Sequence, residues 1–156
     1  MISFRLAAPA EAELIHSITQ DAWEEYRFVP GSSSVFDETV DQIRSTLESG
    51  EHMAVLGLLG DKEVLAVRLR LTDHLYFSRL GVRSAYHGRG YGRMSLAWLE
   101  KFALKSGVNE IRCTVRAAVP RNVYFYESAG YRKIEEQIVV KSKDVQLTVW
   151  TMAKRF

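Results

Sequence analysis

Three glycines at alternate positions, Gly88, Gly90 and Gly92, separate an apolar segment from an amphipathic one. Because glycine has no Cβ atom, a ligand can approach the backbone of such a turn closely. The N–H groups of the turn then converge on one point, and the N-terminus of the following helix adds partial positive charge there. The turn is therefore predicted to hold a phosphate or a pyrophosphate without a dedicated cation.

Two other phosphate-binding motifs do not fit this turn. A dinucleotide-binding turn has the spacing G-x-G-x-x-G directly after its strand. Counted from Gly88, the third glycine of that motif would fall on Arg93, and residues 84–87 also separate the apolar strand from the first glycine. A P-loop requires Gly-Lys-Ser or Gly-Lys-Thr, which does not occur in the chain.

The residues around the turn resemble the GCN5-related N-acetyltransferase (GNAT) superfamily. Residues 87–92 are similar to its Arg/Gln-x-x-Gly-x-Gly/Ala motif, with His87 where the family usually has Arg or Gln. The preceding residues 75–82 resemble the fourth strand of the family, and residues 122–131 resemble its FYE-x-x-GF signature. The order and separation of these motifs fit the family, and the resemblance covers nearly the whole chain.

The resemblance implies that the amides of the turn bind the pyrophosphate of acetyl-coenzyme A (acetyl-CoA). The expected contacts in this turn are His87, Gly88, Arg89, Gly90, Tyr91, Gly92 and Arg93. The position of His87 acts mainly through its backbone, and a histidine there would make binding mildly pH-dependent. The side chains of Arg89, Arg93 and Arg121 are candidates to reach the phosphates. Asn122 is expected either beside the pantetheine arm or as the cap of a short helix.

In this family, two parallel strands splay apart and the CoA arm enters the gap between them. Here these strands would be residues 75–82 and 110–117. A splayed strand leaves N–H and C=O groups that a pantetheine amide chain can satisfy, so the backbone of Leu80 and Val82 is expected to pair with it. The Leu80 N–H matches the family position that bonds the thioester carbonyl. A fixed donor there stabilises the oxyanion of a tetrahedral intermediate.

Tyr126 matches the family tyrosine that acts on the CoA sulfur. A phenol, with a pKa of about 10, stays protonated at pH 7 and can donate to a leaving thiolate whose conjugate acid has a pKa of about 8.5. The alternative role is purely structural, because Tyr124, Phe125 and Tyr131 crowd around it in the sequence. The order of the motifs favours the role of general acid.

The general base is left open. An alkyl amine with a pKa of about 10.4 is neutral in only about one molecule in 2,500 at pH 7, so a proton must leave before attack. Histone-type relatives place a glutamate where this chain has Tyr76, and no other carboxylate lies on residues 75–82. Asp73, Glu24, Glu25 and a chain of water molecules are the candidates.

Length and composition agree with one compact domain, and the mildly basic charge suits a polyanionic cofactor. A chain of 156 residues can bury roughly two-thirds of its unfolded surface. The net charge of +2, with no basic stripe carrying interleaved aromatic residues, does not indicate nucleic-acid binding. The single Cys113 excludes an internal disulfide, fits a reducing cytoplasm, and is expected to be buried rather than nucleophilic. No metal-ligand spacing, signal peptide or membrane span is recognised.

The hydrophobic pattern predicts an α/β fold. A strand–helix–strand unit over residues 75–117 implies a right-handed crossover with two parallel strands, and the other strands are expected to be antiparallel. The result is a mixed, mostly antiparallel sheet with a central splayed pair and helices on both faces, which is the GNAT fold. The expected strands are residues 2–6, 53–59, 64–71, 75–82, 110–117, 133–140 and 145–152. The expected helices are residues 10–26, one capped by Asp37 and ended by Gly50, one from the glycine turn to about 105, and 120–128.

The chain is therefore interpreted as a single GNAT acetyltransferase domain, residues 1–156, that moves an acetyl group from acetyl-CoA to an amine by direct attack. Residues 27–36, expected to be a loop, and the first two helices would shape the acceptor site. The acceptor is left open among small amines, amino acids, antibiotic amines and protein amines. The alternative is a non-catalytic acyl-CoA-binding sensor or interaction module, against which Tyr126 argues. A cytoplasmic location without membrane or nucleic-acid partners is expected, and a homodimer is left open.

Overall fold

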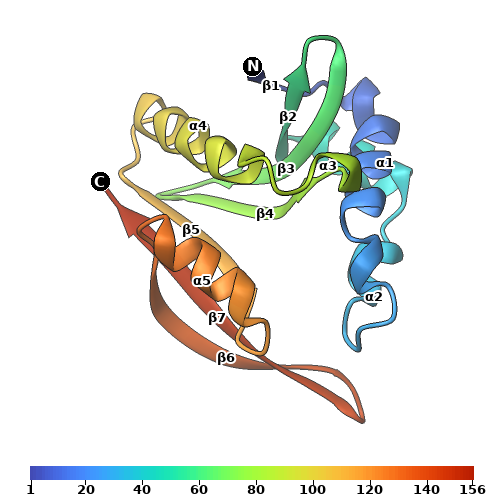
Figure 1. Cartoon of the computed structure of the whole chain (residues 1–156), viewed down its shortest axis with the longest axis vertical. Coiled ribbons are helices and arrows are strands. Elements are labelled where there is room, and N and C mark those ends of the chain that lie inside the picture. The colour runs from blue at the N-terminus through green and yellow to red at the C-terminus, as the bar shows by residue number, and fades with distance from the viewer.

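The protein folds around one seven-stranded sheet with strand order β1-β2-β3-β4-β5-β7-β6 (Figure 1). The computed structural model describes residues 1–156, except for the side chain of Ser33. The strands are β1 (Ile2–Leu6), β2 (Met53–Leu59), β3 (Lys62–Leu71), β4 (Leu75–Val82), β5 (Glu110–Arg116), β6 (Arg132–Ser142) and β7 (Val145–Arg155). The neighbours β4 and β5 are parallel, and the other paired neighbours are antiparallel. The predicted mixed sheet with a central parallel pair is confirmed.

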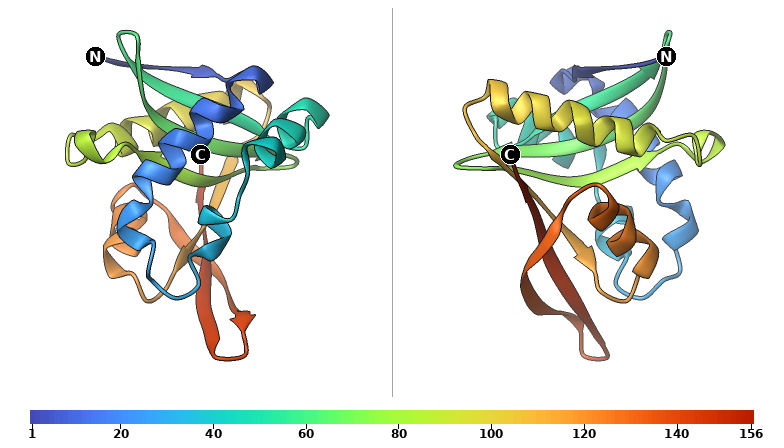
Figure 2. Two further views of the ribbon diagram at one scale, coloured as in Figure 1. Left: turned by 90° about the vertical axis from the view of Figure 1, so that its right-hand side faces the viewer. Right: turned by 60° about the vertical axis from the view of Figure 1, so that its left-hand side comes forward.

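Helices cover both faces of this sheet (Figure 2). The α-helices are α1 (Ala12–Ala22), α2 (Ser33–Phe36), α3 (Val40–Ser49), α4 (Tyr91–Lys105) and α5 (Pro120–Ser128). The short 3-10 helices are η1 (Pro9–Glu11), η2 (Glu24–Tyr26) and η3 (Ser84–Tyr86). Helices α1 and α3 pack on one face, and α4 and α5 pack on the other.

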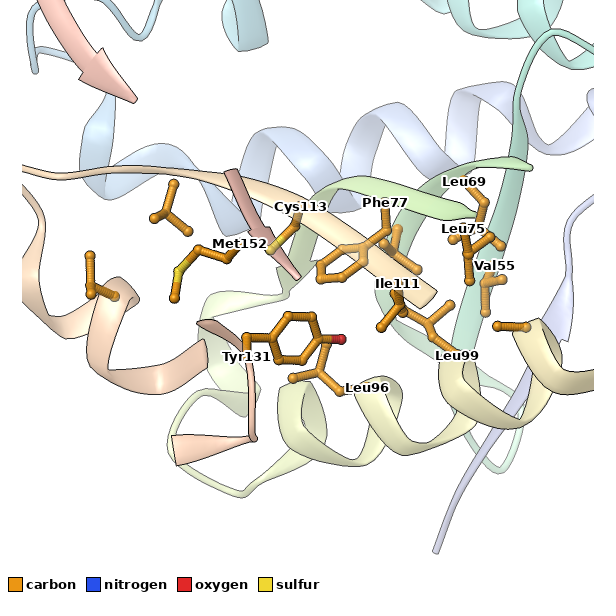
Figure 3. Packing of buried hydrophobic residues seen from close by; sticks show 14 residues of the cluster. Val55, Leu69, Leu75, Phe77, Leu96, Leu99, Ile111, Cys113, Tyr131 and Met152 are labelled. Carbon is orange, nitrogen blue, oxygen red and sulfur yellow. The ribbon is translucent and has the colours of Figure 1, made fainter. Parts of the chain in front are cut away.

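The two faces of the sheet have separate apolar cores because successive strand residues point to opposite sides. On β2, Leu56 packs toward α1 and α3, whereas Val55 belongs to the core under α4. The larger core includes Phe77 of β4, whose ring centroid lies 6.2 Å from that of Tyr131 (Figure 3). Full burial of each such large side chain contributes roughly 1.5–3 kcal/mol to folding.

The N-terminal helical region is more broken than predicted. The single helix expected over residues 10–26 is η1, α1 and η2 in succession, because Trp23, with φ −100° and ψ 4°, leaves the helical conformation. The expected loop over residues 27–36 contains α2.

The N-cap of α3 is Thr39 and not Asp37. The Thr39 Oγ1 accepts a hydrogen bond from the Gln42 N–H at 3.1 Å, and the Gln42 Oε1 accepts one from the Thr39 N–H at 2.8 Å. Asp37 is followed three residues later by Val40, which cannot return such a bond, so the reciprocal capping box forms two residues later, at Thr39. The predicted end of this helix at Gly50 is confirmed, with φ at 77°.

The C-terminal hairpin of β6 and β7 is longer than predicted at both strands. Its ladder continues from Arg132↔Ala153 to Ser142↔Val145, and the hairpin projects from the body of the protein (Figure 1). Nearly all of β6 is exposed, including the apolar Ile138 and Val140, so hydrophobic alternation gives little signal there. Main-chain hydrogen bonds to the partner strand maintain the ladder instead.

Gly81 on β4 lets the end of α1 approach the sheet closely. A Cβ atom at this position would lie 2.6 Å from the Cβ of Ala22. We expect Gly81→Ala to lower the free energy of unfolding by about 1–3 kcal/mol, because one element must move to relieve the overlap. Urea denaturation measures this change.

Gly92→Ala is the matched control for that experiment. A Cβ atom at Gly92 would lie 3.5 Å from the Phe125 ring, which is an ordinary contact. Alanine also favours the helix over glycine by about 0.5–1 kcal/mol. Equal stability losses in the two variants would contradict close packing of α1 on β4.

The described residues contain neither a membrane-spanning helix nor a metal-binding cluster. Across the described chain, no helix has both the length and the apolar character needed to cross a bilayer. Among the described side chains, no cluster of three or more His, Cys, Asp or Glu residues is placed to hold a metal ion.

Candidate active site

The parallel strands β4 and β5 separate soon after they meet. They pair at Leu75↔Ile111 and Tyr76↔Arg112, and over the described residues the ladder ends there. The backbone of β4 from Phe77 onward therefore faces a gap rather than β5. The splay expected from the resemblance is present, and it opens toward the C-terminal ends of the two strands.

A β-bulge lies on β4 within the splayed part. On β3, Ala66 pairs with Gly81 and Arg68 pairs with Ser78, so Arg79 and Leu80 together oppose Val67. Arg79 has a φ of 53°, in the left-handed region that residues other than glycine adopt at a cost. Bulges of this kind take a residue out of the ladder and re-aim its backbone.

The glycine turn follows β4 and leads directly into α4. Gly88 and Gly90 have φ values of 77° and 81°, and Gly90 is the N-cap of α4. A Cβ atom on either residue would meet nothing within 4 Å, so the backbone conformation, and not crowding, explains glycine here. The turn is thus open to a ligand at the positive end of a 15-residue helix.

His87 folds this turn back onto the end of β4. Its Nε2 donates a hydrogen bond to the Val82 carbonyl oxygen at 2.6 Å. The sequence predicted a role for the backbone of His87 and did not reveal this role of its side chain. This bond holds the turn against the end of β4. Because the imidazole bonds Val82, it does not bond the amides of the turn.

Three arginines expected near the phosphates make contacts within the protein. The Arg93 Nη2 donates to the Ser128 Oγ at 2.6 Å, which ties α4 to α5. The Arg89 guanidinium lies over the ring of Tyr86 at 5.3 Å. Arg121 bonds the Tyr26 hydroxyl and pairs with Glu25 at 3.1 Å, which joins α5 to η2.

Tyr126 lies on α5 among aromatic rings at the start of the gap. Its ring centroid is 5.9 Å from that of Phe77, the first β4 residue beyond the paired part, and 5.6 Å from that of Tyr131. Burial raises the pKa of Tyr126 well above its ordinary value, so the phenol is protonated at neutral pH. Among the described residues, no hydrogen bond to its hydroxyl is present, so the proton is available to a ligand.

The structure excludes one of the roles considered for each of Cys113 and Asn122. Burial raises the pKa of Cys113 to about 12, so this buried thiol is not a nucleophile. The N-cap of α5 is Val119, and no side chain caps it. Asn122 therefore does not cap this helix, and its position beside pantetheine stays a prediction.

The carboxylates considered as general bases are engaged elsewhere. Asp73 precedes the paired end of β4, away from the splay, and its Oδ1 lies 2.6 Å from the His74 Nδ1. Glu24 pairs with Arg27 at 2.7 Å. Where the family places a glutamate, the Tyr76 hydroxyl lies 3.3 Å from the Thr114 Oγ1.

Residues 30–34 pass over the gap on the face opposite Tyr126. From β5, Arg116 donates to the Gly31 carbonyl at 2.7 Å and to the Pro30 carbonyl at 3.2 Å. From β4, Arg79 donates to the Ser34 carbonyl at 3.5 Å. One arginine from each splayed strand thus holds the same segment. No signal in the sequence indicates this contact, because the partners are 45 to 86 residues apart.

The splayed parallel pair, with a glycine turn opening the next helix, is the arrangement of the GNAT fold. The comparison with protein families agrees, since residues 15–131 match the acetyltransferase (GNAT) family. That match covers most of the chain, and the protein belongs to this family.

Solved structures share the fold at low sequence identity. An acetyltransferase of the GNAT family from Streptococcus pneumoniae has a TM-score of 0.78 and 16% identity, with 100% of both chains covered. The PaiA N-acetyltransferase from Thermoplasma acidophilum, in complex with coenzyme A, has a TM-score of 0.76 and 14% identity, covering 100% of this chain and 99% of the other. The ribosomal-protein-S18-alanine N-acetyltransferase from Escherichia coli has a TM-score of 0.75 and 18% identity, covering 99% and 94%.

Proposed function

We propose that this protein is an N-acetyltransferase that moves the acetyl group of acetyl-CoA to an amine by direct attack. The observation that carries the proposal is the position of Tyr126 against Phe77, where β4 leaves β5. A partly buried phenol then lies on one side of the gap, and the polar face under residues 30–34 lies on the other. Membership of the acetyltransferase family supports acetyl transfer in general.

The cofactor would lie along the splay. The amides of residues 87–92 would hold the pyrophosphate, with Arg89 and Arg93 at its edge, and the backbone of Leu80 and Val82 would pair with pantetheine beside Asn122. The bulge at Arg79 and Leu80 supports this role, because it takes backbone out of the β3 ladder. The complex of PaiA with coenzyme A supports the choice of cofactor.

The reaction follows from these positions. The amine nitrogen attacks the thioester carbonyl, a C–N bond forms, and the Leu80 N–H stabilises the developing oxyanion. The C–S bond then breaks, and Tyr126 donates its proton to the thiolate. Burial raises the proton affinity of a thiolate as it does that of the phenol, so a bare thiolate is disfavoured in the gap and the sulfur needs a proton as it leaves. The ammonium proton leaves through water, since the candidate carboxylates are engaged elsewhere.

A non-catalytic acyl-CoA sensor is the competing function. Such a protein would need the glycine turn but no proton donor at the sulfur. The hydroxyl of Tyr126, which has no hydrogen-bond partner among the described residues, favours catalysis. The cytoplasmic location stays a prediction from the sequence.

Two measurements on the purified chain test the proposal. Calorimetric titration with acetyl-CoA, coenzyme A and ADP should give the tightest binding for acetyl-CoA and weaker binding for ADP. A thiol-release assay with a panel of amines should then show amine-dependent turnover. Binding without turnover for any amine would identify a sensor, and absence of binding to all three compounds would refute the cofactor site.

A further inference from the structure

Glu38 stands between two arginines on the face of the sheet opposite Tyr126. Arg68 of β3, only 4% exposed, takes both carboxylate oxygens, with its Nη1 2.9 Å from Oε2 and its Nη2 2.7 Å from Oε1. The Nε of Arg79 lies 3.6 Å from the same Oε2. One carboxylate serves two guanidinium groups, so one positive charge is left over.

Arg116 adds a second uncompensated charge beside residues 30–34. Its described contacts are the carbonyl oxygens of Pro30 and Gly31, which carry no formal charge. Burial lowers the pKa of both Arg116 and Arg79, because half-buried guanidinium groups lose hydration. An anion placed here would therefore be stabilised by both groups.

These two charges lie where an acceptor would arrive. Arg79 belongs to the bulge and directly precedes Leu80. Arg116 ends β5, the other wall of the gap. The carboxylate of β5, Glu110, does not neutralise these arginines. It pairs with Arg112 at 2.6 Å and with Arg155 at 2.7 Å, and it lies at the start of β5, before the splay.

We propose that the acceptor is a small molecule carrying both an amine and a carboxylate, as amino acids do, and that Arg79 and Arg116 bind its carboxylate. This inference rests on the proposed function. A guanidinium fork matches a carboxylate in bidentate geometry, and such charged hydrogen bonds are the strong ones.

The same charges assist the chemistry of the amine. Nearby cations disfavour the ammonium form of an acceptor and so increase the neutral fraction that can attack. This effect suits a site whose nearby carboxylate, Glu38, is already paired with arginines. A polyamine, whose remaining charges are positive, would be repelled.

The test compares matched acceptors with the full chain at saturating acetyl-CoA. Amino acids of different side chains are each assayed against the corresponding amino acid amide and decarboxylated amine, with spermidine as the polycation. We expect kcat/KM for the preferred amino acid to exceed that for its amide at least about tenfold, as a charged hydrogen bond implies. Equal or faster transfer to the amide, the simple amine or spermidine would overturn the inference.

Variants assign the preference to the two arginines. Arg79→Gln and Arg116→Gln should each reduce the ratio of kcat/KM for acid over amide at least about fivefold, since one of two binding groups is lost. Arg44→Gln is the charge-matched control, because Arg44 pairs with Asp41 on α3. An unchanged ratio in both folded variants would refute the assignment.

Failure of the inference and failure of the proposed function are distinguishable. Turnover with amides or polyamines but not with amino acids overturns the inference alone. Binding of acetyl-CoA with no turnover for any acceptor overturns the proposed function. If a variant does not fold, the acceptor preference of the unaltered protein still decides the inference.

Discussion

Replacing Tyr126 by phenylalanine is expected to lower kcat about 100-fold while the Kd for acetyl-CoA stays within about twofold. The variant removes the phenol hydroxyl of Tyr126 and leaves the aromatic packing with Phe77 and Tyr131 in place. General acids typically contribute about 10²–10⁴ to rate, and a factor of 100 is about 2.7 kcal/mol of transition-state stabilisation. Steady-state kinetics and calorimetry with the same preparation measure both quantities.

Tyr124→Phe provides the control for this experiment. Tyr124 lies on the same helix, is 72% exposed, and is absent from the aromatic cluster. We expect its kcat to equal that of the unaltered protein. An unchanged kcat in Tyr126→Phe would remove this residue from the mechanism and leave protonation of the thiolate to water.

Replacing Gly90 by aspartate is expected to weaken acetyl-CoA binding about 100-fold. Asp tolerates the left-handed conformation of Gly90 better than most residues, and its Cβ atom would meet nothing within 4 Å. Its carboxylate would stand where the turn is proposed to hold the pyrophosphate. Two like charges about 5 Å apart repel by about 3 kcal/mol at an effective dielectric constant of about 20, which corresponds to about 100-fold in Kd.

Gly90→Asn separates the effect of charge from that of shape. Asn has nearly the same size and tolerates the same backbone conformation, but it carries no charge. We expect its Kd to rise only a fewfold, and we expect the difference between the two variants to shrink as salt is added. Equal losses in both variants would show that the turn does not hold the phosphates.

The helices, strands and turns could be predicted from the sequence because the residues that determine each of them lie close together in the chain. Glycine is the residue that most readily adopts positive φ, and both Gly88 and Gly90 have it. The alternation of apolar residues along β5 predicts which side chains enter the core. The predicted helix bounds are wrong where an interaction with a second residue determines the helix end. Thr39 caps α3 because Gln42 returns its hydrogen bond, and α1 ends at Ala22 although the apolar pattern continues.

The candidate site was predictable only as far as its backbone and its motif residues. The sequence predicted the glycine turn and Tyr126 from short contiguous motifs, and it predicted the parallel pair from the strand–helix–strand unit over residues 75–117. It gave no hint that Arg93 contacts Ser128 or that the His87 side chain bonds Val82. The bulge at Arg79 has no glycine to mark it, and its left-handed φ is imposed by the register with β3.

By itself, the sequence determined the order of the elements, the glycine turn and the resemblance that identifies the family. Only the tertiary structure decided what surrounds the acceptor side of the gap. Arg68, Arg79 and Glu38 come from separate segments, and residues 30–34 meet Arg116 across 85 residues of chain. Such contacts depend on strand register and on the splay, which arise from the packing of the whole sheet, so charge balance at the site follows from the fold and not from any local pattern.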